Sequence, residues 1–208
     1  MRKLTIYLAS LICVFAGFRS SAHAQGKTPD LRPGNFELGL YGGASYGVDA
    51  FHGMGGVNLS YSLPKLLLPY VEFSYFPGIP RQEDNADHTD TFHGSDRLID
   101  FHGGVHIRLA PSESRIVPYG VVGFGVLQSR ITGYTHHNQP LPGQPVDETQ
   151  PTTTGTDPAV NFGGGVRVYQ TSAFGYRAEV KVYRPLSGRF TGVVPKFEGG
   201  IFFQFGGR

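Results

Sequence analysis

Alternation of apolar and polar residues along short segments is the feature that most constrains the fold of this chain. It is clearest over residues 99–109. Successive side chains of a strand point to opposite faces. One face would carry Ile99, Phe101, Val105, Ile107 and Leu109, and the other Asp100, His102, His106 and Arg108. Such a strand needs an apolar medium on one side and a polar medium on the other.

Seven further segments alternate in a similar way and predict strands. They cover residues 36–42, 57–63, 68–76, 119–131, 160–168, 176–182 and 197–205. The segment 119–131 is apolar on both faces at first, which leaves its register open. Short turns follow the second, fourth and sixth segments, and long polar stretches follow the third and fifth. The pattern predicts an all-β fold, an eight-stranded antiparallel up-and-down barrel with loops 77–96 and 133–158 exposed at one end.

The N-terminus has the three parts of an export signal. Basic residues precede an apolar run over residues 4–18, and an Ala-x-Ala site ends at Ala24. The run is too short for a helix that spans a membrane. We therefore expect a signal peptide over 1–24 that is cleaved after Ala24, an N-terminal segment over 25–34 and a barrel domain over 35–208.

Charge and cysteine content exclude several classes of function. Removal of residues 1–24 takes away Arg2, Lys3 and Arg19, so 18 basic and 16 acidic residues become 15 and 16. No basic tract remains, so we expect no binding of nucleic acid. The only cysteine, Cys13, lies in the predicted signal peptide. Packing and backbone hydrogen bonds must hold the mature fold without disulfides.

Alternation alone leaves open whether the apolar face points outward to lipid or inward to an apolar ligand. A soluble lipocalin-like carrier would turn that face inward. Here the apolar faces carry no charge, whereas the polar faces carry charges of both signs that could pair inside a narrow barrel. This favours a transmembrane barrel of the outer membrane. Arginine at Phe101 should then be costly and arginine at His102 tolerated.

Three segments resemble a known family of barrels. They are residues 118–125, 161–167 and 198–205, with the sequences PYGVVGFG, NFGGGVR and EGGIFFQF. These segments are similar to strands of the outer-membrane β-barrel domain family, the small eight-stranded opacity-protein-like or porin-like barrels. The resemblance implies location in the outer membrane of a Gram-negative-type bacterium. It carries no catalytic motif.

Possible metal and catalytic groups have simpler explanations. His102 and His106 lie about 13 Å apart along an extended strand, too far to share one metal ion. Residues 83–96 and the pair His136-His137 offer oxygen and nitrogen ligands, but 83–96 lacks the spacing of a calcium loop. His93 and Ser95 lack the surroundings of a nucleophile. We therefore expect no catalytic residues, no cofactor and no metal site.

These observations predict a membrane protein that is not an enzyme. Eight strands leave an interior that side chains can fill, so a wide pore is not expected. The expected role is in envelope structure or in surface interaction, with outer-membrane lipids as partners and external ligands bound through loops 77–96 and 133–158. The expected state is a monomer. Two alternatives stay open, a soluble exported carrier of apolar ligands and, less favoured, a lipid-modifying enzyme of the outer membrane.

Overall fold

The structure, a computed structural model, describes residues 34–47, 50–63, 66–110, 114–186 and 193–206. Its strands are β1 (Asn35–Gly47), β2 (Ala50–Tyr61), β3 (Leu67–Asp84), β4 (Asp90–Arg108), β5 (Ile116–His137), β6 (Asp147–Thr149), β7 (Thr153–Tyr169), β8 (Phe174–Pro185) and β9 (Val194–Gly206). Among these residues, none forms a helix long and apolar enough to cross a membrane. The predicted signal peptide over 1–24 lies outside the described residues.

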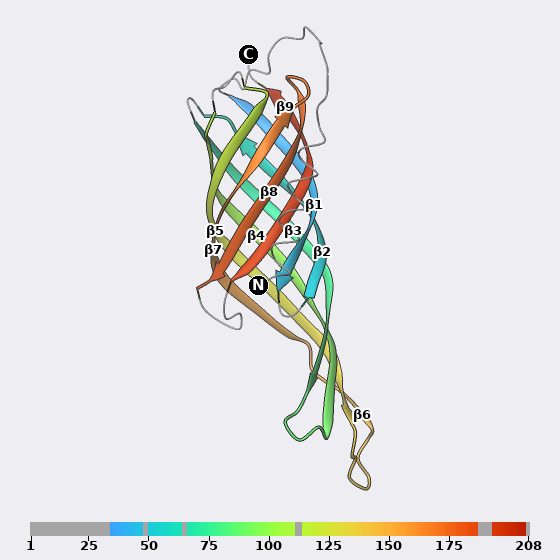
Figure 1. Cartoon of the computed structure of the whole chain (residues 1–208). Coiled ribbons are helices and arrows are strands. Elements are labelled where there is room, and N and C mark those ends of the chain that lie inside the picture. The colour runs from blue at the N-terminus through green and yellow to red at the C-terminus, as the bar shows by residue number, and fades with distance from the viewer. Residues whose placement is uncertain (1–33, 48–49, 64–65, 111–113, 187–192, 207–208) are drawn as a thin grey trace, which may run out of the picture.

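Eight of the strands form a closed antiparallel barrel. Neighbours in sequence pair along the wall, β1 pairs with β9, and β4 pairs with β5, so that no strand of the barrel is left as a free edge (Figure 1). The remaining strand, β6, is short and lies outside the barrel. It pairs only with the end of β5 in the protruding direction. The predicted eight-stranded up-and-down barrel is confirmed.

The predicted loops 77–96 and 133–158 are wrong in their bounds, because most of these residues are strand. β3 continues to Asp84, β4 begins at Asp90, β5 runs to His137 and β7 begins at Thr153. Beyond the barrel they form a protruding sheet of 79–84, 90–96, 131–137, β6 and 153–157 (Figure 1). Polar side chains occur on both faces there, so the hydropathy alternation disappears although the hydrogen-bond ladder continues.

The other end of the barrel is plain, as the sequence predicts. The connections between β2 and β3, between β4 and β5, and between β7 and β8 are all short. The barrel therefore has one end with tight turns and one end with the protruding sheet. This is the asymmetry of membrane barrels that keep short turns on the periplasmic side and longer segments outside.

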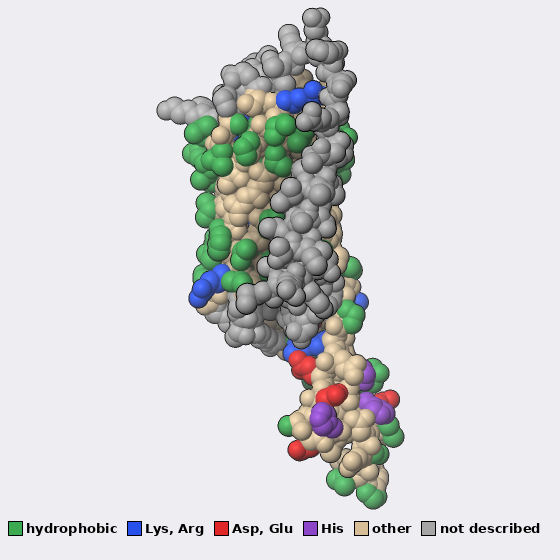
Figure 2. All heavy atoms as spheres, viewed as in Figure 1, with side chains coloured by type: hydrophobic (Ala, Val, Ile, Leu, Met, Phe, Trp, Pro, Cys, Tyr) green, Lys and Arg blue, Asp and Glu red, His purple; other side chains and the backbone are tan. Residues whose placement is uncertain are grey.

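The apolar face of each barrel strand points outward. Phe101 is 53% exposed, whereas its neighbours Asp100 and His102 are 1% and 0% exposed. Along β8, Tyr176 is exposed and Lys181 is buried. Figure 2 shows hydrophobic side chains over the outside of the barrel, above the more polar protruding sheet. The predicted orientation is confirmed, and the inward apolar face of a soluble carrier is not what the structure has.

Inside, the barrel is filled by three layers of side chains. An apolar layer near the protruding sheet contains Tyr41, Met54, Phe76, Leu98, Leu127, Ala159 and Tyr183. A second apolar layer near the tight turns contains Leu68, Val117, Tyr169 and Phe202. Most of the buried ionisable side chains lie between these two layers, whereas Asp96 and Asp157 lie beyond Leu98 and Ala159, toward the protruding sheet. The ionisable side chains between the layers form the first candidate site.

Candidate functional site

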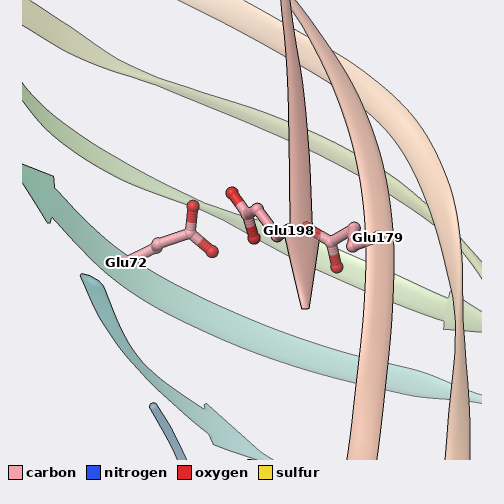
Figure 3. Close-up of side chains that lie close together, drawn as sticks. All are labelled: Glu72, Glu179 and Glu198. Atoms are coloured by element: carbon pink, nitrogen blue, oxygen red, sulfur yellow. The ribbon is translucent and has the colours of Figure 1, made fainter. Parts of the chain in front are cut away.

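Three carboxylates meet at the centre of the lumen. Glu72 comes from β3, Glu179 from β8 and Glu198 from β9, and strand alternation turns all three inward (Figure 3). One oxygen of each lies within 4.8 Å of the others. All three side chains are buried. Three uncompensated carboxylates in such a space would repel one another strongly.

Two buried lysines offset two of these charges, and Arg177 offsets the third, with its Nη2 3.8 Å from Glu72 Oε2 and 3.5 Å from Glu198 Oε2. Lys181 Nζ lies 2.5 Å from Glu72 Oε1, 2.7 Å from Glu179 Oε1 and 3.3 Å from Glu198 Oε1. Lys196 Nζ lies 3.1 Å from Glu72 Oε1 and 2.8 Å from Glu198 Oε1. We call the three glutamates and the two lysines the lumen ion cluster. They link β3, β8 and β9 across the lumen.

The lumen ion cluster does not fit a metal ion. Hard divalent cations need oxygen ligands with free lone pairs directed at one point. In this cluster the Oε1 oxygens of Glu72 and Glu198 each face both lysine ammonium groups, and Glu179 Oε1 faces Lys181. A cation held by these oxygens would lie beside the positive charges of both lysines and of Arg177. The carboxylates are held by side chains of the protein itself.

A second group of ionisable residues lies beside this cluster. Arg167 Nε donates to Glu37 Oε1 over 3.0 Å, and its Nη2 lies 2.7 Å from His106 Nδ1. The Arg167 guanidinium also lies 4.2 Å from the centre of the Tyr119 ring. Tyr119 in turn donates to Glu179 Oε2 over 2.5 Å. The two groups therefore form one continuous network through the lumen.

The two lumen histidines belong to different parts of this network. His102 contacts Asp100 through Nδ1 and meets the edge of the Tyr183 ring, with centroids 4.7 Å apart. His106 stacks on Tyr70 at 4.2 Å. Strand spacing predicts that they do not share a metal, and the structure gives each its own partners. Both are fully buried.

Sequence reasoning predicted a lumen face with charges of both signs but missed Lys196 and the lumen tyrosines. Lys196 Nζ also lies 2.9 Å from Ser74 Oγ and 3.3 Å from Tyr183 OH. A signal was present, because Lys196 lies two residues before Glu198 and so shares its face. Tyrosines 41, 70, 119, 169 and 183 all point inward. Tyrosine fits an apolar pattern because of its aromatic ring, so the alternation did not reveal the tyrosine hydroxyl groups as lumen partners.

The protruding sheet carries a different set of groups, half-buried histidines paired with acids. His137 Nδ1 lies 2.8 Å from Asp90 Oδ1, and its Nε2 lies 3.6 Å from Glu148 Oε2. His136 Nδ1 lies 2.6 Å from Asp147 Oδ1. The hydrogen bond with Asp90 raises the pKa of His137 above its ordinary value. These pairs fasten the ends of β4, β5 and β6 to one another.

The metal and nucleophile hypotheses for residues 83–96 gain no support. Among the described residues, the only cluster of three potential ligands is the glutamate trio of the lumen. His93 stacks on Tyr134 with centroids 5.3 Å apart. Asp96 is buried, whereas Ser95 is half-buried on the other face of β4. The strand therefore separates the carboxylate from the serine hydroxyl that it would have to assist.

The fold is supported by comparison with solved structures, whereas comparisons of the sequence found no match. No protein-family model matches the chain, and no curated protein matches it. A major outer membrane protein from Thermus thermophilus aligns with a TM-score of 0.56 at 10% identity, covering 82% of this chain and 99% of that one. The fold is that of a small outer-membrane β-barrel.

Two further barrels have the same fold. The N-terminal β-barrel domain of Pseudomonas aeruginosa OprF aligns with a TM-score of 0.53 at 14% identity, covering 83% of this chain and 98% of that one. Ail, the attachment invasion locus protein of Yersinia pestis, aligns with a TM-score of 0.50 at 12% identity, covering 84% and 100%. At these identities the likeness to outer-membrane β-barrels concerns the fold.

Proposed function

We propose that this protein spans an outer membrane as a sealed barrel and presents the protruding sheet outside the cell, in an envelope-structural or surface-interaction role without enzymatic activity. The observation that carries the proposal is the division between the two faces. The outer wall is apolar, and charged groups pair inside a lumen that apolar layers close at both ends. Contact with lipid requires an apolar outer wall. A diffusion pore requires an open lumen, which the described part of this barrel lacks.

The protruding sheet is the part that would meet external ligands. Its turn over 138–146 is exposed throughout and contains three prolines. The hairpin of β3 and β4 ends in a turn in which Asn85 Oδ1 accepts from the backbone of Thr89 and Asp90. Loop-rich ends held by a rigid barrel are where binding functions concentrate. The attachment named for Ail is a function of this type.

The proposed partners are therefore membrane lipids around the wall and external molecules at the sheet. We also propose that the protein is a monomer, because closure of the barrel leaves no strand edge in the wall to pair with another copy. The carrier alternative has no supporting observation in the described lumen, which is filled by ionic and aromatic side chains. The enzyme alternative likewise has no assembled catalytic group among the described residues.

Fractionation of the bacterial envelope tests the location. We expect the protein in the outer-membrane fraction, with a faster gel mobility before boiling than after it. Protease added to intact cells should cut within residues 138–146 and leave the barrel whole. A protein found dissolved in the periplasm, or cleavage only after the outer membrane is broken, would overturn the proposal.

A further inference from the structure

Two arginines face each other on the outer wall. Arg97 of β4 and Arg130 of β5 are directly paired in the ladder, and both are exposed. Like charges in this position repel each other and destabilise a sheet. No ion pair joins either arginine to a carboxylate in the part of the chain that the structure describes. An anion shared by both guanidinium groups would relieve the repulsion.

The pair lies at the level where the apolar wall ends. The outward residues that precede it from the tight-turn side are Ile99 paired with the exposed Gln128, and then Phe101 paired with Val126. On the protruding sheet, the next outward pair is Ser95 with Thr132, which offers hydroxyl groups. Figure 2 shows basic side chains where the hydrophobic band gives way to this sheet. Lipid headgroups would lie at this level of a membrane barrel.

A cavity of about 450 Å³ opens one strand away from Arg97. It lies between β2 and β3 and is lined by Gly53, Met54, Gly55, Tyr75, Phe76, Pro77 and Gly78. The ladder between these strands ends at Gly55 and Tyr75, although both strands continue. Volumes of this order are typical of small-molecule sites.

A β-bulge makes the cavity and brings it next to the arginine pair. The register of β3 against β4 shifts between Phe76 and Ile79, opposite Arg97. Gly78 has a φ of +141°, which other residues adopt only with strain. A Cβ placed on Gly78 would lie 3.4 Å from Ser95 Oγ, so the bulge touches the strand that carries Arg97.

The lining of the cavity is suited to a hydrocarbon chain. Met54 and Phe76 belong to the apolar lumen layer near the protruding sheet, and Tyr75 belongs to the lipid-facing wall. Gly53 and Gly55 leave the space where outward side chains would stand. The cavity therefore lies at the level of the arginine pair and borders the end of the apolar wall at Tyr75.

We propose that this edge of the barrel binds one phosphate-bearing membrane lipid. Its phosphate lies between Arg97 and Arg130, and one hydrocarbon chain enters the cavity between β2 and β3. The proposal rests on the membrane location proposed above. Inorganic phosphate has the same headgroup chemistry but no hydrocarbon chain to fill the cavity. An experiment can therefore distinguish a lipid phosphate from free phosphate as the ligand.

The first arm of the experiment tests the arginine pair. The full mature protein is placed in phosphatidylcholine nanodiscs with a minor fraction of phosphatidic acid, and bound lipid is counted by native mass spectrometry. We expect the variant Arg97→Gln/Arg130→Gln to retain about fivefold less phosphatidic acid than the unchanged protein. The control is Arg184→Gln, because Arg184 is also exposed but faces Val160 in the ladder. It should retain phosphatidic acid normally.

The second arm tests the cavity. Gly53→Leu should fill it and lower retention of phosphatidic acid by a similar factor. Gly120→Leu on β5 is the matched control, because a Cβ on either glycine would meet nothing within 4 Å. Gly120 lies outside the cavity, so its variant should keep the lipid. An excess of inorganic phosphate should compete poorly, since it lacks a chain.

The outcomes separate the possibilities. Equal retention by the unchanged protein and the double arginine variant overturns the proposal, as does an equal loss in Arg184→Gln. Loss in the arginine variant without loss in Gly53→Leu, or easy displacement by inorganic phosphate, shows an anion site that binds no lipid chain and also overturns it. A protein that folds and inserts normally but selects no lipid leaves the membrane location intact. Failure of the unchanged protein to insert overturns both.

Discussion

Lys196 of β9 donates a hydrogen bond from Nζ to Oδ2 of Asp100 on β4 over 2.9 Å, although β9 and β4 are not neighbours in the barrel wall. The contact crosses the lumen. The same ammonium group also reaches Glu72 on β3 and Glu198 on its own strand. A single lysine thus joins three strands, and its buried position makes the contact depend on every partner being present.

Replacement of this lysine should be one of the most destabilising single changes in the lumen. Lys196→Met keeps much of the side-chain volume but leaves Glu72, Asp100 and Glu198 with less compensating charge. Breaking a buried ion pair from one side costs about 3–5 kcal/mol. We expect a loss of this size in the free energy of unfolding, measured by urea titration in detergent micelles with gel mobility as the readout.

A double variant provides the control for this effect. Lys196→Met/Glu198→Gln removes one positive and one negative charge together, so it should be more stable than Lys196→Met alone. The opposite order, or a loss below about 1 kcal/mol for Lys196→Met, would show that the lumen ions contribute little beyond filling space.

The outward position of Phe101 leads to a second prediction. Phe101→Arg would place a charge in the apolar wall and should cost about 2–4 kcal/mol if the residue lies near the bilayer midplane. Thr132→Arg is the control, because Thr132 also points outward but lies in the protruding sheet. It should change the free energy of unfolding in liposomes by less than about 1 kcal/mol. Equal costs for the two variants would contradict a lipid-facing wall.

The sequence predicted which face of each barrel strand is buried but not how full the lumen is. Period-two alternation identified the faces of Phe101 and Asp100 correctly, because a strand has only two faces. The burial of His102 argues against the expectation that His102→Arg is tolerated. His102 is fully enclosed between Asp100 and Tyr183, and a longer side chain has no room there. Contacts across the lumen depend on register and closure, which alternation does not encode.

The same limit explains the misplaced loops and the partly predicted site. Residues such as Arg81 and Thr154 lie in strands with water on both sides, where backbone pairing continues without an apolar face. The lumen charges were found because each interrupts an apolar pattern in its own segment. The pairing of Arg97 with Arg130 could not be found, because residues of two strands become neighbours only when the register of β4 and β5 is known.

A third prediction concerns pH and the end of the protruding sheet. The hydrogen bond with the Asp90 carboxylate raises the pKa of His137 above its ordinary value of about 6.5. A raised pKa in the folded state means that this pair stabilises the sheet fully below about pH 6.5. The contribution is lost as the pH rises through the raised value.

Histidine NMR titration and amide exchange would measure this effect. We expect the amides at the end of the β4–β5 pairing to have larger protection factors at about pH 5.5 than at about pH 8. Asp90→Asn should lower the pKa of His137 and reduce the difference. The control is His88→Gln, because His88 lies in the exposed turn, 3.9 Å from Asp84, and outside the β4–β5 ladder. Protection that rises with pH would contradict the proposed role of the pair.

The fourth prediction tests the close packing of strands in the wall. A Cβ on Gly163 of β7 would overlap the carbonyl oxygen of Val180 on β8, and backbone atoms of this kind cannot move aside cheaply. Gly163→Ala should therefore cost about 1–3 kcal/mol in the free energy of unfolding. Gly120→Ala is the matched control, since a Cβ there meets nothing within 4 Å and alanine suits a strand better than glycine does. In a urea titration in detergent micelles, Gly120→Ala should leave the free energy of unfolding unchanged or slightly raised. An equal loss in both variants would show that the spacing of β7 and β8 is looser than the structure describes.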